Sequence, residues 1–334
     1  MLTTLFLRYK EIKKKYDIEL ISGKFLTELT GNFIPTTLSL DIALHGGIRE
    51  GTVTSISSPA KAGKTSLCLK ILANAQKMGK NVYYCDAEGR LSPELLNCID
   101  GLDKEKLNII TSSKDKFLTA EAHMNIVETL LRDDPGCVVV VDSIAALCPE
   151  GEYADDVKGN GRSSTPKLMY SFFRKIAQMI RPNKSTLIVI THLQANTSGY
   201  GSPFKEVGGN GQQYFASNWL MAKSVKKIEN NEKKEIGKDT MFTVLASQSG
   251  APGGEATIYV RYGRGCDKYE EVISLGEELD IIEKSGAWYQ FSESLPELAS
   301  KKLKFQGRQN LALHLMANKE DFDIIENKIR ETAL

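Results

Sequence analysis

The chain has 334 residues, of which 41% are hydrophobic and 25% charged, and its net charge is +1. This length supports one large α/β domain with small appendages, and the composition is typical of a soluble globular protein. The near-neutral charge excludes a global attraction to nucleic acid, so such binding would depend on local basic patches. No apolar run is long enough to span a membrane. Six scattered cysteines without a C-x-x-C pair predict a reducing, cytoplasmic location and no structural zinc.

Residues 1–35 are predicted to form an N-terminal helix and a linker. Apolar residues recur there at spacings of three and four between charged residues: Leu2, Leu5, Tyr9, Ile12 and Tyr16. This pattern predicts an amphipathic helix over residues 2–17. The apolar stripe of such a helix needs a partner, which is either its own domain or a neighbouring subunit.

Between residues 36 and 268, short β-branched runs alternate with helical stretches. Strands are expected near 52–57, 81–85, 137–142, 185–191, 216–223, 240–247 and 256–262, and helices near 64–78, 118–132 and 165–180. This alternation predicts an α/β fold with a mostly parallel sheet covered by helices, which binds ligands at the carboxyl ends of its strands. Residues 269–334 are predicted to form a separate small module with one strand-like patch at 287–291.

The segment from Ser58 to Ser66 lies between a predicted strand and a predicted helix. It differs from the phosphate-loop pattern G-x-x-x-x-G-K-[ST] only at its first residue. In this pattern, backbone N–H groups and the helix dipole bind a polyanion. Lys64 would reach the β- and γ-phosphates of a nucleoside triphosphate, and Thr65 would hold Mg²⁺. The expected nucleotide-binding residues are Ser58, Pro59, Ala60, Lys61, Ala62, Gly63, Lys64, Thr65 and Ser66.

Ser58 stands where the phosphate-loop pattern has glycine. A serine there is expected either to adopt a left-handed conformation at some energetic cost or to shift the loop.

Two predicted strands place carboxylates beside this loop. The apolar run 137–142 is typical of a buried parallel strand and ends in Asp142, which is expected to hold Mg²⁺ opposite Thr65. The run 81–85 leads into Asp-Ala-Glu, in which Glu88 is a candidate general base for an attacking water. Alone, this tripeptide is more typical of a helix start.

A third apolar run, 186–190, leads to His192. This position favours a sensor of the γ-phosphate, and the alternative is a core histidine bonded to the backbone. Two long polar segments, Pro149–Thr165 and Leu193–Gln213, interrupt the alternation and are expected to be functional loops. A third, Lys223–Asp239, has the mixed charge of a solvated hairpin tip.

Taken in order, several motifs resemble those of RecA-type recombinases. They are Leu38–Leu44, the phosphate loop, Asp86-Ala-Glu88, Val141–Leu147, Gly208-Gly-Asn210 and Gly286-Ala-Trp-Tyr289. The resemblance runs from about residue 36 to the C-terminus. It implies a polymerisation helix in residues 1–35, a RecA-like ATPase core in 36–268 and a small C-terminal domain in 269–334. It also implies a helical homo-oligomeric filament on single-stranded DNA that pairs with homologous duplex DNA and exchanges strands while hydrolysing ATP.

The resemblance carries roles onto matching residues. Glu88 matches a catalytic glutamate, and Lys64, Thr65 and Asp142 match residues that bind ATP and Mg²⁺. His192 stands where bacterial members have a glutamine that links the γ-phosphate to the second DNA loop. Segments 149–165 and 193–213 match the DNA-binding loops. The matching DNA-contact positions are Lys167, Arg174, Gly208, Gly209, Asn210 and Gly211.

The chain also departs from the bacterial pattern. Ala246 and Gln248 stand where bacterial members place two lysines that reach the neighbouring subunit's γ-phosphate. The missing charge is expected to come from elsewhere, for example a bound K⁺ ion, or hydrolysis is slow. Leu95 and Ser92 replace two residues that contact adenine, and Tyr214 keeps an interface aromatic. Leu95, Tyr214 and Gln248 complete the expected nucleotide-binding set.

Three functions fit these observations. The first is a strand-exchange recombinase with DNA-stimulated ATP hydrolysis. The second is a helicase or branch-migration motor on the same core, against which Gly286–Tyr289 argues. The third is a recombination mediator that binds ATP and DNA but hydrolyses little, which Ser58, Ala246 and Gln248 favour. The expected location is the cytoplasm, or the host cytoplasm if the protein is viral, with nucleoid association when bound to DNA.

Overall fold

The computed structural model describes residues 12–16, 31–154, 165–195, 204–206 and 211–334. Most of the predicted N-terminal helix and the motif Gly208–Asn210 lie outside the described residues. The chain divides into two compact units, Met1–Asn32 and Phe33–Leu334. In the first unit, residues 12–16 are helical and exposed, which agrees with that part of the predicted helix.

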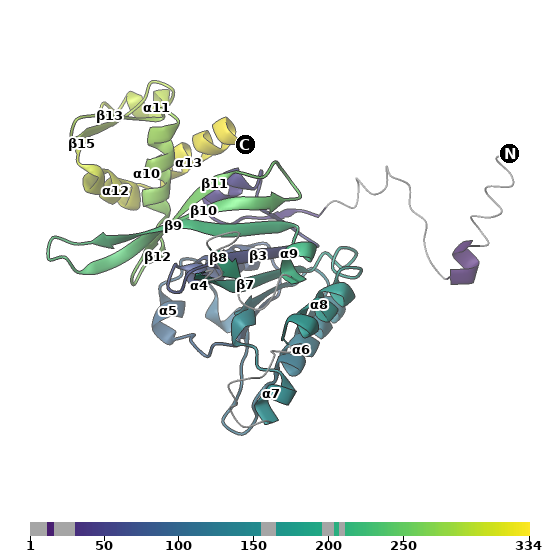
Figure 1. The fold of residues 1–334 in the computed structure, drawn as a ribbon. Helices are drawn as coiled ribbons and strands as arrows, with labels where there is room; N and C mark the ends of the chain where they lie inside the picture. The colour runs from purple at the N-terminus through teal and green to yellow at the C-terminus, as the bar shows by residue number, and fades with distance from the viewer. Residues whose placement is uncertain (1–11, 17–30, 155–164, 196–203, 207–210) are drawn as a thin grey trace, which may run out of the picture. The chain divides into compact units, whose positions relative to one another are not determined.

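The second unit is built on one large sheet (Figure 1). Among the described residues, its ten strands follow the order β12-β11-β10-β9-β3-β7-β6-β4-β5, with β8 beside β7. The parallel strands are β9 (Asn218–Glu229), β3 (Val53–Ser58), β7 (Thr186–Ala195), β6 (Val138–Asp142), β4 (Val82–Asp86) and β5 (Leu107–Ile110). The antiparallel additions are β10 (Glu235–Ser247), β11 (Glu255–Arg261), β12 (Gly265–Cys266) and β8 (Phe204–Glu206). The predicted mostly parallel α/β sheet is confirmed.

Helices cover both faces of this sheet because its central strands are buried on both sides. Val138 and Val140 share a core with α4 (Lys64–Lys77), whereas Val139 and Val141 share another with α6 (Ala120–Asp133) and α8 (Thr165–Ile176). Successive strand residues point to opposite faces, so an unbroken valine run supplies both cores. Shorter elements connect these: β1 (Phe33–Ile34), α3 (Leu38–Ala43), β2 (Ile48–Arg49), α5 (Pro93–Asn97), η1 (Lys104–Lys106), η2 (Ile144–Ala146), α7 (Glu150–Ala154) and α9 (Gly211–Phe215).

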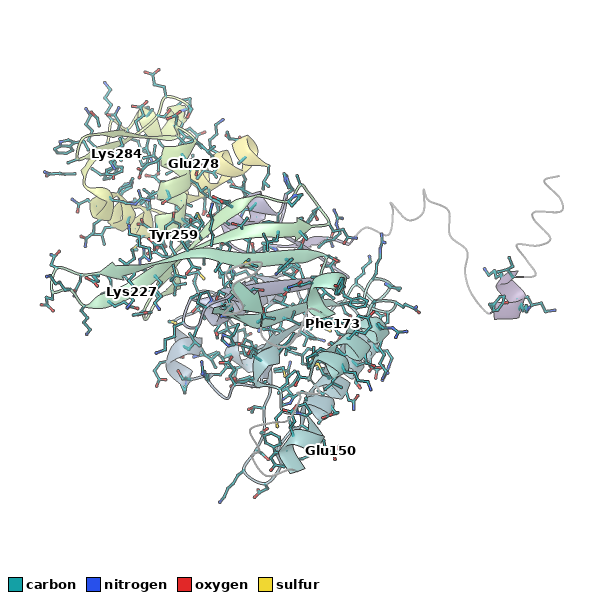
Figure 2. All side chains as sticks on the ribbon, viewed as in Figure 1. Glu150, Phe173, Lys227, Tyr259, Glu278 and Lys284 are labelled. Atoms are coloured by element: carbon teal, nitrogen blue, oxygen red, sulfur yellow. The ribbon has the colours of Figure 1, made fainter. Side chains whose placement is uncertain are left out.

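The C-terminal residues form a small helical layer with its own sheet. Its elements are α10 (Lys268–Glu278), β13 (Ile282–Ser285), β14 (Trp288–Phe291), α11 (Pro296–Ala299), β15 (Lys304–Gln306), α12 (Arg308–Ala317) and α13 (Lys319–Ala333). The sequence predicted one strand here, but β14 pairs on both sides, with β13 and β15. Figure 2 shows Lys284 on this sheet and Glu278 on α10.

Buried polar contacts tie this region to α3. The Ser39 backbone N–H and hydroxyl donate to Glu271 at 2.9 and 2.8 Å, and Arg330 pairs with the buried Asp41 at 3.2 Å. Buried charges of this kind are tolerated when they are paired or hydrogen-bonded. The C-terminal region therefore packs on the sheet domain through specific contacts.

Two of the predicted loops contain regular structure. The segment 149–165 begins with α7, and 193–213 begins with the end of β7, which pairs with β8. The polar segment 223–239 is mostly strand, because β9 and β10 extend through it and leave only Asn230–Lys234 as the tip. Lys227 lies on this projecting hairpin (Figure 2). Within the described residues, no helix has the length and apolar character needed to cross a membrane.

Candidate functional site

The strands that carry the predicted site residues end at one edge of the sheet. The order β3-β7-β6-β4 makes them neighbours, and the parallel register places Ser58 opposite His192 and Asp86 opposite Asp142. Ligands of open α/β sheets bind at this kind of edge. The fold therefore brings together the phosphate loop, both carboxylate strands and His192.

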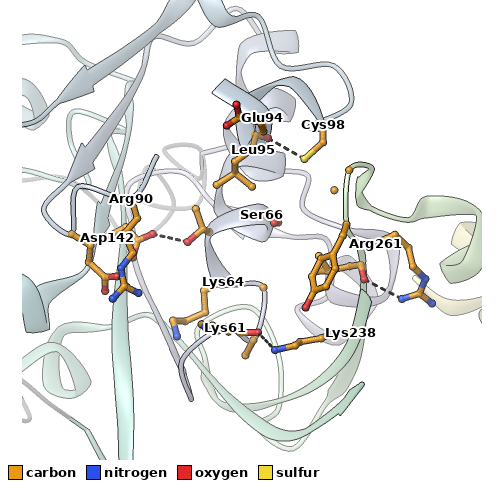
Figure 3. Close-up of a pocket in the computed structure, with 18 of the residues that line it drawn as sticks. Lys61, Lys64, Ser66, Arg90, Glu94, Leu95, Cys98, Asp142, Lys238 and Arg261 are labelled. Carbon is orange, nitrogen blue, oxygen red and sulfur yellow. Dashed lines mark hydrogen bonds and ion pairs between the residues drawn. The ribbon is translucent and has the colours of Figure 1, made fainter. Parts of the chain in front are cut away.

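A cavity of about 460 Å³ lies at this edge (Figure 3). Its lining includes Lys61–Ser66 of the phosphate loop together with Glu88, Asp142 and His192. Leu95 and residues 260–263 also line it. This volume is within the range of small-molecule sites. The cavity is thus lined both by a phosphate loop and by apolar and aromatic side chains, which suit contact with a nucleotide base.

The phosphate loop takes its sharp turn at Lys61 and Gly63, whose φ angles are +60° and +87°. A Cβ atom on Gly63 would lie 2.7 Å from Val260 Cγ2, so a larger residue is excluded there by both conformation and space. Thr240 Oγ1 donates to the Ala62 carbonyl at 2.8 Å, and Lys238 Nζ donates to the Lys61 carbonyl at 2.7 Å. Strand β10 therefore holds the loop in shape.

Ser58 does not adopt the left-handed conformation expected where the motif has glycine. It is the last residue of β3, fully buried, and the left-handed residues of the loop are Lys61 and Gly63 instead. Its hydroxyl accepts a hydrogen bond from Lys64 Nζ at 2.8 Å. A serine at this position thus fits the loop without backbone strain.

Lys64 is held inside the loop. Its ammonium also donates to the carbonyls of Ser58 and Pro59, at 3.1 and 3.0 Å. Only 5% of the residue is exposed, and burial lowers the pKa of Lys64 to about 8 despite the nearby charges of Asp142 and Glu88. This buried cation is a strong site for an anion.

We expect replacement of Ser58 with glycine to destabilise the protein. The change frees the backbone of a buried strand and removes one acceptor of Lys64, which together lower the free energy of unfolding by about 1 kcal/mol or more. Urea denaturation would measure this difference, and Ser58→Ala would separate the hydroxyl from the backbone effect. A more stable glycine variant would mean that Ser58 is strained after all.

Asp142 and Thr65 form the predicted metal end of the cavity. Thr65 Oγ1 and the Tyr84 hydroxyl both donate to Asp142 Oδ2, at 2.8 and 2.5 Å. Burial raises the pKa of Asp142, although both hydrogen bonds oppose this rise. Within the described residues, no three His, Cys, Asp or Glu side chains gather as a metal cluster. A hydroxyl and a carboxylate that share an open cavity fit Mg²⁺ bound jointly to a phosphate substrate.

Glu88 is surrounded by hydrogen-bond donors. Its Oε1 accepts from Ser143 Oγ at 2.7 Å and lies 2.5 Å from His192 Nε2, while Arg90 Nη1 lies 2.9 Å from Oε2. Burial acts to raise the pKa of Glu88, but the bonds from His192 and Ser143 and the charge of Arg90 lower it overall. His192 therefore contacts Glu88, the candidate general base, directly. It is not only a core histidine bonded to the backbone.

Sequence reasoning missed nine of the residues that line the cavity, among them three cations and a tyrosine. Arg90 lies two residues beyond Glu88, and Lys238, Arg261 and Tyr262 come from β10 and the end of β11. The only local signal for Tyr262 was its place before Gly263 and Gly265, which give the chain room beside a ligand. Apart from Arg90, which follows β4, these residues lie on the antiparallel strands β10 and β11 or directly after them.

Other predicted residues lie away from this cavity. Tyr214 is 78% exposed on α9, and Gln248 is exposed just beyond β10, so neither lines the cavity of its own chain. Their contact with a neighbouring subunit's nucleotide stays a prediction. Lys167 and Arg174 are exposed on α8, and Gly211 begins α9. Gly208, Gly209 and Asn210 lie outside the described residues.

Comparison with known proteins identifies two family domains along the chain. Residues 10–267 match the model of the RecA N-terminal domain, and residues 270–334 match that of the RecA C-terminal domain. The chain belongs to the RecA family. It is 35% identical to Protein RecA of Helicobacter hepaticus over 298 residues, which cover 88% of this chain and 82% of that protein. It is 34% identical to Protein RecA of Helicobacter pylori over 299 residues, with coverage of 89% and 82%.

Membership of the RecA family supports a role in DNA recombination and repair with ATP and DNA as ligands. The phosphate-loop cavity is the candidate site for the nucleotide in this chain.

Proposed function

We propose that this protein is an ATP-dependent recombinase that forms a filament on single-stranded DNA and exchanges strands with a homologous duplex. The observation that carries the proposal is the convergence of Lys64, Thr65, Asp142 and Glu88 on one cavity in a RecA-family chain. Hydrolysis of ATP would reset the filament. The competing mediator function differs in having little turnover.

In the proposed site, the loop N–H groups and Lys64 bind the phosphates, and Thr65 and Asp142 hold Mg²⁺. When bound, Mg²⁺ neutralises charge on the phosphate oxygens. Glu88 orients a water and accepts its proton, which its lowered pKa allows because the carboxylate is ionised at neutral pH. His192 links Glu88 to the start of the segment 193–213. This contact offers a route by which DNA in that segment could affect the base.

The proposed DNA surface includes α8. Lys167 and Arg174 are seven residues apart, so they lie on the same side of the helix two turns apart, and both are exposed. Lys175, beside them, pairs with Glu128 at 3.1 Å and has part of its charge compensated. Two cations on one exposed helix face can contact the phosphate backbone of DNA without contacting its bases, so this binding does not depend on DNA sequence.

We expect single-stranded DNA to stimulate ATP hydrolysis by the wild-type protein, and we expect the double variant Lys167→Ala, Arg174→Ala to lose most of this stimulation. Each removed phosphate contact should reduce the slope of log affinity against log salt by about one. Lys175→Ala is the matched control. Hydrolysis assays with and without DNA and salt titrations of DNA binding give the two readouts.

Two outcomes would oppose this function. A sequence-selective loss of DNA binding would contradict the assignment of α8 to the DNA backbone. Intact ATP and DNA binding without turnover in the wild-type protein would instead indicate the mediator.

A further inference from the structure

Arg90 occupies a fixed place at the wall of the nucleotide cavity. It lies in the turn that follows β4, where its backbone N–H donates to Asp86 Oδ1 and that of Leu91 donates to Asp86 Oδ2, both at 3.0 Å. Asp86 is itself buried. These two backbone hydrogen bonds fix the turn, so the Arg90 side chain extends from a rigid segment next to Glu88.

The guanidinium of Arg90 is anchored at one point. Nη1 lies 2.9 Å from Glu88 Oε2, whereas Oε1 of the same carboxylate is shared by Ser143 and His192. The Arg90 side chain is 70% exposed, and the residue lines the cavity. Because exposed ion pairs contribute little, this contact leaves Arg90 available to a stronger anion.

The positive charge of Arg90 is close enough to Lys64 to affect its pKa. Although burial is the main cause that lowers the pKa of Lys64, Arg90 contributes to this lowering because its positive charge lies close by. Arg90, Asp142 and Lys64 all line the cavity (Figure 3). Lys61, Lys238 and Arg261 also line the cavity, but Lys238 pairs with Glu235 and Arg261 with Asp239. A cavity lined by several cations favours a polyanion.

No such cation comes from the end of β10. Ala246 is neutral and pairs in register with Trp219, and the exposed Gln248 does not line the cavity. We infer that Arg90 supplies, from within the same chain, the positive charge that stabilises the γ-phosphoryl group in the transition state of hydrolysis. The inference rests on the proposed ATPase function and names a further catalytic residue for it.

The step balances without any additional reactant. The oxygen of water bonds to the γ-phosphorus, and the bond from this phosphorus to the bridging oxygen breaks with its electron pair left on ADP. The water proton passes to Glu88. Arg90 exchanges no atoms, but its guanidinium leaves the ion pair with Glu88 Oε2, donates hydrogen bonds to the γ-phosphate oxygens and so leaves one carboxylate oxygen free for the water. Planar guanidinium groups match phosphate oxygens in this way.

The test compares Arg90→Ala with wild type as full-length proteins. We expect kcat in the presence of single-stranded DNA to fall by about 10²-fold or more. ADP binding, followed with a fluorescent analogue, should change by less than about threefold, because the phosphate loop is intact. Addition of aluminium fluoride, which mimics the transferring phosphoryl group, should tighten ADP binding in wild type but not in Arg90→Ala.

Two further variants sharpen the result. Arg90→Lys should recover only part of kcat, because an ammonium is a point charge without the guanidinium fork. Arg132→Ala removes another partly exposed arginine that is paired with acidic side chains, and it should match wild type in every readout. Thermal melting of each variant verifies the fold.

The outcomes separate this inference from the function on which it rests. If wild-type protein hydrolyses ATP and Arg90→Ala is equally active or faster, the inference is overturned and the ATPase stands. Hydrolysis that requires K⁺ over Na⁺ and is unaffected by Arg90→Ala would assign the charge to a bound ion. Absence of both hydrolysis and aluminium fluoride response in wild type would overturn the ATPase and, with it, the role of Arg90.

Discussion

Replacement of Glu88 with glutamine is expected to reduce ATP hydrolysis by about 10²- to 10⁴-fold, the usual contribution of a positioned general base. The amide cannot accept a proton from water, but its oxygen can still accept hydrogen bonds from Ser143 and His192. The phosphate loop is unchanged, so ATP binding should persist. Steady-state hydrolysis and equilibrium binding of a fluorescent ATP analogue measure the two effects separately.

The control for this prediction is Glu278→Gln, which makes the same chemical change on the exposed surface of α10 (Figure 2). It should hydrolyse ATP at the wild-type rate. Equal rates in wild type and Glu88→Gln would remove Glu88 from the chemistry. ATP-dependent DNA binding in Glu88→Gln should be at least as strong as in wild type, because the bound ATP is consumed more slowly.

Replacement of Lys64 with methionine is expected to weaken ATP binding by about 10- to 10²-fold, because it removes a charged hydrogen-bond donor to the phosphates. Hydrolysis should fall further, by about 10²-fold or more, since the same charge stabilises the transition state. Methionine keeps the length of the buried side chain, although it loses the hydrogen bonds of Lys64 to Ser58 and Pro59. Nucleotide titration and hydrolysis assays measure both, with the exposed Lys106→Met as control.

The same pair of proteins tests the burial of Lys64. Burial places the pKa of Lys64 at about 8 in the folded protein, below the 10.5 of an exposed lysine. Between these values the unfolded chain binds more protons than the folded chain, so the stability of wild type should rise with pH relative to Lys64→Met. Urea denaturation of both proteins from pH 7.5 to 10 measures this difference. A constant difference would show that Lys64 is not buried in solution.

Local patterns predicted those parts of the site that lie within one continuous segment. The phosphate loop carries its own backbone N–H groups, so its function follows from Gly63, Lys64 and Thr65 wherever a strand precedes and a helix follows. Likewise, a run of valines ending in Asp142 is a strand that must be buried on both faces. These elements were found because the residues that act together are also neighbours in sequence.

Long-range pairing decided what local patterns could not reveal. Lys238, Arg261 and Tyr262 reach the cavity only because β10 and β11 continue the sheet beyond β9. Ser58 looked unfavourable by its position in the motif, yet it fits because the loop turns at Lys61 and Gly63 instead. The position of the strands in the sheet decided the first case, and the backbone conformation of the loop decided the second.

The sequence by itself therefore determined the fold class, the phosphate loop and the carboxylates at the strand ends, because periodicity and motif spacing act over a few residues. Only the tertiary structure decided that His192 and Arg90 both contact Glu88 and that the charge of Arg90 reaches Lys64. Such contacts depend on strand order, register and the turn held by Asp86, which bring together groups separated by up to about a hundred residues. Hydrogen bonds and charge interactions depend on the distance between groups, and packing determines which groups are close.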